Sequence, residues 1–184
     1  MAVNQDQIWD HYQNDAPDSF SGSDTRINYL INQIPKGAVC LNIGVGAGNL
    51  EKFAKQKSID VHSLDPSIRS IENLKSLIGE NAKVGYSQAI PFDNESFDVV
   101  IMTEVLEHLE SDVLIKTYSE VYRVLKSNGK FIGTVPSNED LSANVVVSPS
   151  DGYIFHRWGH LQSFSINRLE KDLGSDFKKV RAKE

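Results

Sequence analysis

The segment that most constrains this chain is an apolar run that breaks into three closely spaced glycines. Residues 38–43 are almost all apolar, which is typical of a buried strand, and Gly44, Gly46 and Gly48 follow at once. Apolar residues with a helical period begin again at residue 50. Glycines between a buried strand and a helix let the backbone turn tightly and let a ligand approach the helix N-terminus closely. The sequence therefore predicts a strand, a ligand-binding loop and a helix, in that order.

The rest of the chain repeats this alternation of strands and helices. Alternating units close into a parallel sheet with helices on both faces, so we predict an α/β, Rossmann-like, doubly wound fold with a mostly parallel sheet. Between residues 137 and 163 there is little periodicity but several aromatic side chains, which is typical of a functional loop. The expected strands are residues 38–43, 60–64, 83–86, 97–102, 130–135 and 177–182, and the expected helices cover 24–34, 50–54, 68–78, 112–125 and 166–173.

Length and composition indicate one globular domain. The chain has 184 residues, of which 40% are hydrophobic, and carries a formal net charge of -6, which gives no general attraction to nucleic acid. A lone cysteine excludes an internal disulfide, and no run of 18 apolar residues or signal peptide occurs, so we expect a cytoplasmic protein without a membrane span. Within the domain we expect an N-terminal helical cover (1–36), a cofactor-binding core (37–136), and a substrate loop with a C-terminal helix and strand (137–184).

The spacing of the glycines distinguishes two classes of nucleotide-like ligand. A dinucleotide fingerprint would need a third glycine at position 49, where the chain has Asn49, so a nicotinamide-dependent oxidoreductase is disfavoured. About 20 residues after the loop, at the end of the second expected strand, Asp65 supplies a carboxylate placed to accept two ribose hydroxyls. The alternative interpretation of Asp65 is a turn beside Pro66 that flanks a helix.

At this point the sequence resembles the class I S-adenosylmethionine-dependent methyltransferases, of the type 11 or type 23 kind. The resemblance extends from about residue 28 to residue 179. That family adds further strands at the end of its sheet, so the resemblance implies that this sheet lacks the last one. The segments that carry the resemblance are residues 39–48, 64–65, 90–92, 96–100, 104–109 and 124–131.

The resemblance implies S-adenosylmethionine as the cofactor. In that family the glycine loop holds the methionyl part, the acid after the second strand holds the ribose, and the segment before a Pro-Phe pair contacts adenine. Asn42 stands where the family usually carries an acid, and the acid expected near Tyr86 is also missing, so part of the hydrogen bonding must be rearranged. The cofactor-binding residues implied are Asn42, Gly44, Gly46, Gly48, Asp65, Ser87, Gln88 and Thr103.

A second motif could hold a metal ion. Glu104, Glu107 and His108 stand at i, i+3 and i+4, so a helical backbone would project all three from one face. With a later histidine, the pattern resembles metal-dependent methyltransferases that modify ubiquinone precursors or the terminal ribose of small RNAs. Of His156 and His160, we prefer His160 as the fourth ligand for Mg²⁺, Mn²⁺ or Zn²⁺. The alternative is a metal-free site in which His108 caps a helix or faces the substrate.

Two functional hypotheses follow. The first is methyl transfer to a hydroxyl oxygen of a small metabolite, with His108 and Glu104 as catalytic residues: His108 takes the proton as a base, or a bound cation lowers the pKa of the hydroxyl. The second is a non-catalytic S-adenosylmethionine-binding regulatory or scaffold subunit, which Asn42 and the open sheet edge favour. The expected partner is a small-molecule acceptor, and a homodimer is left open. Aromatic side chains in 153–164, and a helix through Tyr12, could cover the two substrates.

Overall fold

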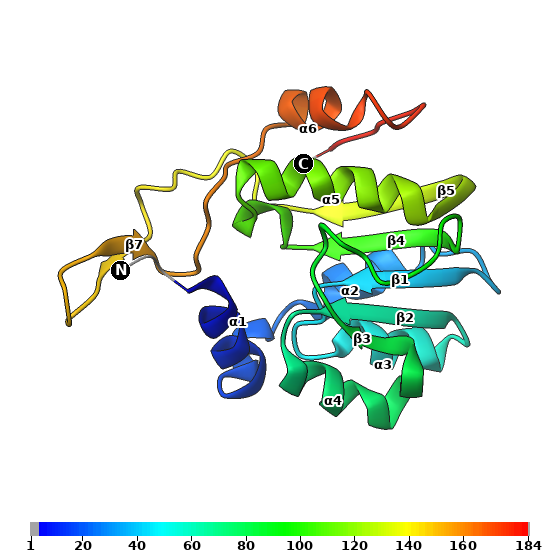
Figure 1. Cartoon of the computed structure of the whole chain (residues 1–184), viewed down its shortest axis with the longest axis horizontal. Coiled ribbons are helices and arrows are strands. Elements are labelled where there is room, and N and C mark those ends of the chain that lie inside the picture. Colours follow the sequence, from blue (N-terminus) through cyan, green and yellow to red (C-terminus); the bar gives the residue numbers. More distant parts are fainter. Residues whose placement is uncertain (1–3, 184) are drawn as a thin grey trace.

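Five parallel strands form the centre of the structure, in the order β3-β2-β1-β4-β5 (Figure 1). The structure is a computed structural model that describes residues 4–183. Helices flank this sheet, which confirms the predicted Rossmann-like α/β fold. The strands are β1 (Val39–Ile43), β2 (Asp60–Asp65), β3 (Ala82–Val84), β4 (Phe97–Thr103) and β5 (Leu125–Thr134).

The register of the sheet brings the ends of three strands together. β1 pairs with β2 on one side, where Ile43 lies opposite Leu64, and with β4 on the other side, where Ile43 lies opposite Met102. The strand order therefore reverses at β1. In open α/β sheets, ligands bind beyond the carboxyl ends of the strands at such a point of reversal. The fold thus places the glycine loop, which follows β1, at the expected ligand site.

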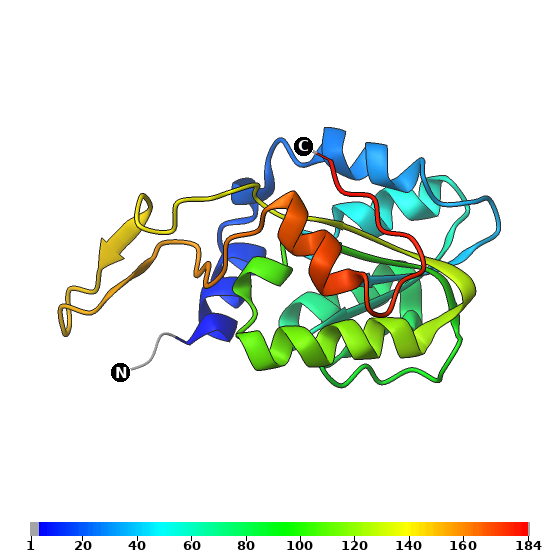
Figure 2. The same cartoon turned by 90° about the horizontal axis from the view of Figure 1, so that it is seen from above.

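Helices cover both faces of the sheet (Figure 2). α2 and α3 pack on one face, on the side chains of Cys40 and Val99, whereas α5 packs on the other face, on those of Leu41 and Val100. Of the helices in residues 4–183, none is long and apolar enough to cross a bilayer. The helices are α1 (Gln5–Asn14), α2 (Asp24–Ile31), α3 (Asn49–Gln56), α4 (Ile68–Ile78), α5 (Ser111–Val124) and α6 (Ile166–Leu173), with 3₁₀ turns η1 (Pro17–Phe20), η2 (Gly79–Asn81) and η3 (Leu106–His108).

The C-terminal segment differs from the prediction. The strand expected at 177–182 is wrong, because these residues form no ladder with β5 or with any other described strand. The ring of Phe177 packs instead against those of Tyr122 and Phe131, each at a centroid distance of 5.9 Å. A single apolar anchor followed by two lysines does not fix a strand register. Within the described residues the sheet therefore ends at β5, one strand earlier than expected.

The segment after β5 carries a hairpin that the sequence analysis did not predict. β6 (Val145–Val147) and β7 (Ile154–His156) pair antiparallel and project beyond the carboxyl ends of the strands (Figures 1 and 2). The signal was present in the sequence: three valines precede a Ser-Pro-Ser-Asp-Gly turn, and β-branched runs beside such turns favour hairpins. The predicted functional loop is thus partly ordered by its own strand pair, and it shares one end of the molecule with α1.

Two isoleucines, one buried in the sheet and one exposed on α5, allow a matched test of where the core lies. Ile101 on β4 is fully buried, whereas Ile115 on α5 is 66% exposed. We expect Ile101→Ala to lower the free energy of unfolding by about 2–5 kcal/mol, since it removes buried methyl groups and leaves a cavity. Ile115→Ala should change it by less than about 0.5 kcal/mol. Urea unfolding of both variants measures the difference, and equal effects would contradict the burial described.

Candidate functional site

The glycine loop after β1 has a backbone that only glycine adopts without strain. Gly44, Gly46 and Gly48 have φ values of +83°, +53° and +73°, all in the left-handed region. A Cβ on Gly44 would lie 2.5 Å from Cγ2 of Val105, in the segment after β4. The loop therefore needs glycine both for its backbone conformation and for the close approach of a second segment, and it leads directly into α3, whose N-cap is Gly48.

Asp65, the last residue of β2, joins the strand to this loop. It is 2% exposed, and its Oδ2 accepts hydrogen bonds from the backbone N–H of Val45 at 2.9 Å and from Nε2 of Gln13 at 3.0 Å. Its Oδ1 accepts the N–H of Ser67 at 2.9 Å. Burial raises the pKa of Asp65, and these donors oppose the rise. The structure thus brings the predicted ribose-binding carboxylate beside the predicted loop.

Asn42 is linked to a carboxylate that the sequence analysis missed. Glu51 on α3 is fully buried, and its Oε1 accepts from Nδ2 of Asn42 at 2.7 Å and from Oγ of Ser63 at 2.6 Å. Burial raises the pKa of Glu51. An acid on the helix therefore lies beside the position on β1 where the family usually carries one. The available signal was a charged residue directly after Leu50, within the apolar face of that helix.

These buried groups fit the polar end of the cofactor. Among residues 4–183, neither Oδ1 of Asn42 nor Oε2 of Glu51 has a hydrogen-bond partner, although both are buried. Unpaired buried acceptors are unfavourable, and an ammonium donor beside them would remove that cost. They lie at the end of β1 and in the helix that follows the glycine loop, where the methionyl part of S-adenosylmethionine is expected.

The other predicted cofactor neighbours lie at the same end of the sheet, at or after the carboxyl ends of their strands. Thr103 is the last residue of β4 and is half-buried. Ser87 is buried after β3, and its hydroxyl is within 2.8 Å of that of Thr117 on α5, while Gln88 beside it is half-buried. Because the hydroxyl of Ser87 already has a partner in α5, its contact with adenine stays a prediction, as does that of Gln88.

The N-terminal segment contacts this site; of the helical cover expected over residues 1–36, residues 1–3 lie outside the described part of the chain. A Cβ on Gly46 would lie 3.1 Å from the ring of Phe20, and that ring packs near Trp9 at a centroid distance of 6.4 Å. Nε2 of Gln13 meanwhile donates a hydrogen bond to Oδ2 of Asp65. A carboxylate has about four acceptor positions, and three are in use here. Two ribose hydroxyls can therefore both bind Asp65 only when the hydrogen bond from Gln13 to Asp65 breaks.

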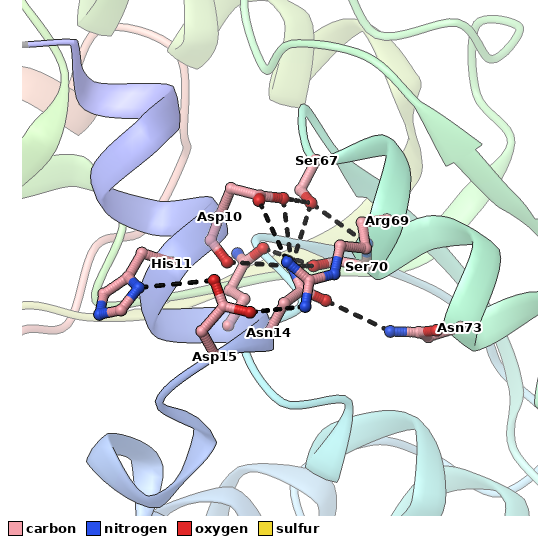
Figure 3. A network of polar contacts seen from close by, with 9 residues as sticks. Asp10, His11, Asn14, Asp15, Ser67, Arg69, Ser70 and Asn73 are labelled. Atoms are coloured by element: carbon pink, nitrogen blue, oxygen red, sulfur yellow. Dashed lines mark hydrogen bonds and ion pairs between the residues drawn. The ribbon is translucent and has the colours of Figure 1, made fainter.

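Polar contacts hold this cover on α4 (Figure 3). Oγ of Ser67 donates to Oδ1 of Asp10 at 2.6 Å, and the guanidinium of Arg69 contacts Oδ1 of Asp15 at 2.6 Å. Nδ2 of Asn14 donates to Oγ of Ser70 at 3.1 Å. The pair of Arg69 and Asp15 is exposed, where an ion pair stabilises by only about 0.2–1 kcal/mol, whereas the contacts of Ser67 and Asn14 are partly buried. The cover is therefore fastened to α4 by several separate polar contacts, each of modest strength.

The residues after β4 depart from the predicted helix. Glu104 has a left-handed backbone, with φ of 54°, and only the 3₁₀ turn η3 follows. The prediction that Glu104 projects from the same helical face as Glu107 and His108 is therefore wrong. Its carboxylate accepts from the hydroxyl of Thr134 at 2.8 Å and pairs with Arg26 at 3.7 Å. The left-handed turn directs it to neighbours other than the predicted metal ligands.

Glu107 and His108 instead meet a histidine from the segment after β7. Candidate ligand atoms of Glu107, His108 and His160 all lie within 4.8 Å of one another, and those of Glu139, His156 and His160 form a second such group. Burial raises the pKa of Glu107 to about 8, and burial lowers the pKa of His108 to about 3. Three of the four predicted ligands are thus brought together. The sequence analysis missed Glu139 and did not choose His156.

A groove of about 300 Å³ lies between α1 and the hairpin β6–β7. The hydroxyl of Tyr12 contacts the backbone carbonyl of Arg157 at 3.4 Å across it. The same two segments reach His108, because the ring of Trp9 lies 4.4 Å from its ring and the carbonyl of Gly159 lies 3.2 Å from its Nδ1. The lining residues are Ile8, His11, Tyr12, Val146, Phe155 and Arg157.

The comparison with protein families identifies the domain. Residues 41–133, half of the chain, match the family model described as a methyltransferase domain. The matched region contains the glycine loop, Asp65, and the segment with Glu107 and His108. The chain belongs to this family, and its fold is that of a class I S-adenosylmethionine-dependent methyltransferase domain, with S-adenosylmethionine as the cofactor.

Individual relatives agree with this assignment. An uncharacterized methyltransferase of Anoxybacillus flavithermus is 28% identical over 62% of this chain and 54% of its own length. A sarcosine/dimethylglycine N-methyltransferase of Aphanothece halophytica is 30% identical over 83% of this chain and 57% of its own length. The chain thus spans little more than half of these relatives. The 1,6-didemethyltoxoflavin-N1-methyltransferase of Burkholderia thailandensis, solved with S-adenosylhomocysteine, shares the fold with a TM-score of 0.68 at 14% identity, covering 96% of this chain and 80% of that one.

The contact between Gln13 and Asp65 predicts how the cover opens. Gln13→Ala removes a buried partner of Asp65 and of Ser70, whose hydroxyl donates to Oε1 of Gln13 at 2.7 Å. We expect the amides of α1 to exchange hydrogen roughly 5–30-fold faster, since about 1–2 kcal/mol of local stability is lost. Gln7→Ala, at an exposed position of the same helix, is the matched control. If hydrogen exchange is equally fast in both variants, Gln13 does not fasten the cover.

Proposed function

We propose that this chain transfers the methyl group of S-adenosylmethionine to a hydroxyl oxygen of a small metabolite. The observation that carries the proposal is the placement of two sites at one end of the sheet. The glycine loop and Asp65 would form the cofactor side. Val105 approaches Gly44 of the loop, and its backbone carbonyl accepts the N–H of His108 at 3.1 Å, which links the loop to the buried group around His108. A methyl group carried at the loop would lie near polar groups suited to a hydroxyl acceptor.

The rate of this reaction depends more on the alignment of the two substrates than on a strong acid or base. The hydroxyl oxygen forms a bond to the methyl carbon while the bond from that carbon to sulfur breaks, and S-adenosylhomocysteine leaves. The sulfonium is already activated, so holding the two substrates in line supplies much of the rate. α1 and the segment after β5 would exclude water from both substrates, because they meet through the contact of Tyr12 with Arg157.

The surroundings of His108 distinguish between its two candidate roles, a base and a metal ligand. Its Nδ1 lies 3.2 Å from the carbonyl oxygen of Gly159, which can only accept, so Nδ1 carries the proton and Nε2 has a free lone pair. Burial disfavours the charged form of an imidazole, which makes His108 better suited to be a neutral ligand than a base. We therefore assign it to a divalent cation together with Glu107 and His160. Such a cation, when bound, would lower the pKa of the acceptor hydroxyl, so that the proton passes to water before the cover closes over the two substrates.

The acceptor class has one competing candidate. The relative that matches most of this chain at 30% identity is named for methylation of an amine nitrogen. An amine acceptor would enter neutral and would need no cation to lower its pKa. The buried cation ligands favour the hydroxyl, and the name of that relative favours the amine.

Cofactor binding tests the first half of the proposal. Asp65→Ala should weaken the binding of S-adenosylmethionine by roughly 10–100-fold, since the ribose loses a charge-assisted hydrogen-bond acceptor. Asp60→Ala, at an exposed position at the start of the same strand, should leave the affinity within about twofold. Titration calorimetry measures both. Equal affinities of the two variants would contradict the assigned ribose site.

Assays of methyl transfer test the second half of the proposal, which is the chemical class of the acceptor. With labelled S-adenosylmethionine and matched panels of hydroxylated and amine metabolites, we expect label in the hydroxylated acceptors, and we expect a chelator to reduce it. Label confined to amines, unaffected by chelator, would replace the proposal with N-methylation. Binding of the cofactor without transfer to any acceptor would favour a regulatory or scaffold subunit instead.

A further inference from the structure

The hairpin β6–β7 presents one of its two faces to α1, at the end of the molecule that they share (Figure 1). Residues directly opposite each other in an antiparallel pair point to the same face. Val146 lies opposite Phe155, and both line the groove, whereas Ile154 points to the other face and is 61% exposed. On α1, Ile8 and Tyr12 stand four residues apart and form the facing wall. Both walls of the groove are therefore largely apolar.

Arg157 places a guanidinium at this groove. It directly follows β7, its backbone N–H donates to the carbonyl of Asn144 at 2.8 Å, and its carbonyl accepts from the hydroxyl of Tyr12 at 3.4 Å. The guanidinium carbon lies 5.1 Å from the centroid of the Trp158 ring, within the range of a cation–π contact. Among residues 4–183 no carboxylate pairs with this guanidinium. Its N–H donors are therefore available to a ligand.

The acids on the two segments that form the groove all have other partners. These pairs are Asp6 with Tyr86, Asp10 and Asp15 with Arg69, Glu139 with His156 and His160, Asp140 with Ser142, and Asp151 with Tyr153. An exposed arginine alone is hydrated and defines no site. Here the unpaired charge lies beside two apolar walls, and the carboxylates of α1 and of residues 137–163 are engaged elsewhere. The groove is thus complementary to a group that is both apolar and negatively charged.

The size and chemistry of the groove restrict this group further. A guanidinium is a planar fork of donors, which matches the two oxygens of a carboxylate. The rings of Tyr12 and Phe155 and the aliphatic side chains beside them suit an apolar body. A volume of about 300 Å³ is at the lower end of the range for small-molecule sites. One guanidinium on a chain of net charge -6 gives no attraction to a polyanion. A small organic acid fits best.

We propose that this groove binds the acidic, apolar end of the methyl acceptor, with its carboxylate on Arg157 and its body against Phe155 and Tyr12. The ring of Tyr12 lies 6.0 Å from that of Trp9, and the ring of Trp9 lies 4.4 Å from that of His108. The groove therefore leads along α1 toward the buried group around His108. The inference rests on the proposed function for the identity of the ligand as the acceptor, and it names the acceptor class: a hydroxylated carboxylic acid with an aryl or acyl body.

Binding of acid probes tests the groove itself. The whole chain is titrated without cofactor, because the groove is formed with α1 in the position described. 3-Phenylpropanoate and octanoate represent the aryl and acyl bodies, and their amides are the uncharged counterparts. By calorimetry we expect one of the acids to bind roughly 10–100-fold more tightly than its amide, since only the acid forms a charge-assisted pair. The acid that binds identifies the body. Equal binding of acid and amide, or binding of neither acid, would overturn the inference.

Matched variants locate the binding. Arg157→Gln should weaken binding of the acid by roughly 10–100-fold, whereas Arg181→Gln, at another exposed arginine, should leave it within about twofold. Phe155→Ala should weaken binding of acid and amide alike by roughly 5–30-fold, and Ile154→Ala, on the other face of the same strand, should not. Equal losses in Arg157→Gln and Arg181→Gln would show unspecific attraction and contradict the site. If Phe155→Ala disrupts the hairpin by circular dichroism, Arg157→Gln decides.

Turnover separates this inference from the proposed function. With hydroxylated acids and matched neutral acceptors, Arg157→Gln should reduce the preference for the acids in kcat/KM by roughly 10–100-fold, mainly through KM. Acid binding that depends on Arg157, without methyl transfer to any acceptor, would refute only the proposed function. Methyl transfer to hydroxyl groups with no preference for acids, or with a preference that Arg157→Gln leaves unchanged, would refute only this inference.

Discussion

The hydrogen bonds of the Asp65 carboxylate connect the parts of the structure on which its function depends. One carboxylate receives the glycine loop through Val45, the start of α4 through Ser67, and the N-terminal cover through Gln13. Because the side chain is buried, each of these donors is held more firmly than it would be at the surface. One group therefore contacts the loop, the start of α4 and the cover at once, and it is the proposed ribose site.

Local patterns in the sequence were sufficient for the parts of the site that lie within one strand-loop-helix unit. Gly44, Gly46 and Gly48 predicted a tight loop between strand and helix, and the spacing to Asp65 predicted the neighbouring carboxylate. The helix expected at 68–78 is observed as α4 with the same bounds. Apolar periodicity records which face of an element is buried, so the alternation of strands and helices along the chain followed from it. The strand expected at 177–182 fails because one aromatic residue cannot specify a pairing partner.

Contacts between distant segments could not be predicted in this way. Glu51 is of a residue type usually found at the surface; its place beside Leu50 was a signal for its burial, but only the packing of α3 on the sheet shows that Asn42 is its partner. Glu139 and His156 approach His160 because the segment after β5 folds back on η3, which no periodicity records. Glu104 lies outside both candidate ligand groups for a backbone reason, since a left-handed residue breaks the helix that the i, i+3, i+4 spacing assumed.

The central claim is that the ribose of S-adenosylmethionine replaces Gln13 on Asp65. A crystal structure of the chain with S-adenosylhomocysteine tests it most directly. We predict both ribose hydroxyls within hydrogen-bond distance of the Asp65 carboxylate, the amino group near Asn42 and Glu51, and α1 displaced from its position here. A cofactor bound elsewhere, with the contact between Gln13 and Asp65 intact, would contradict the account.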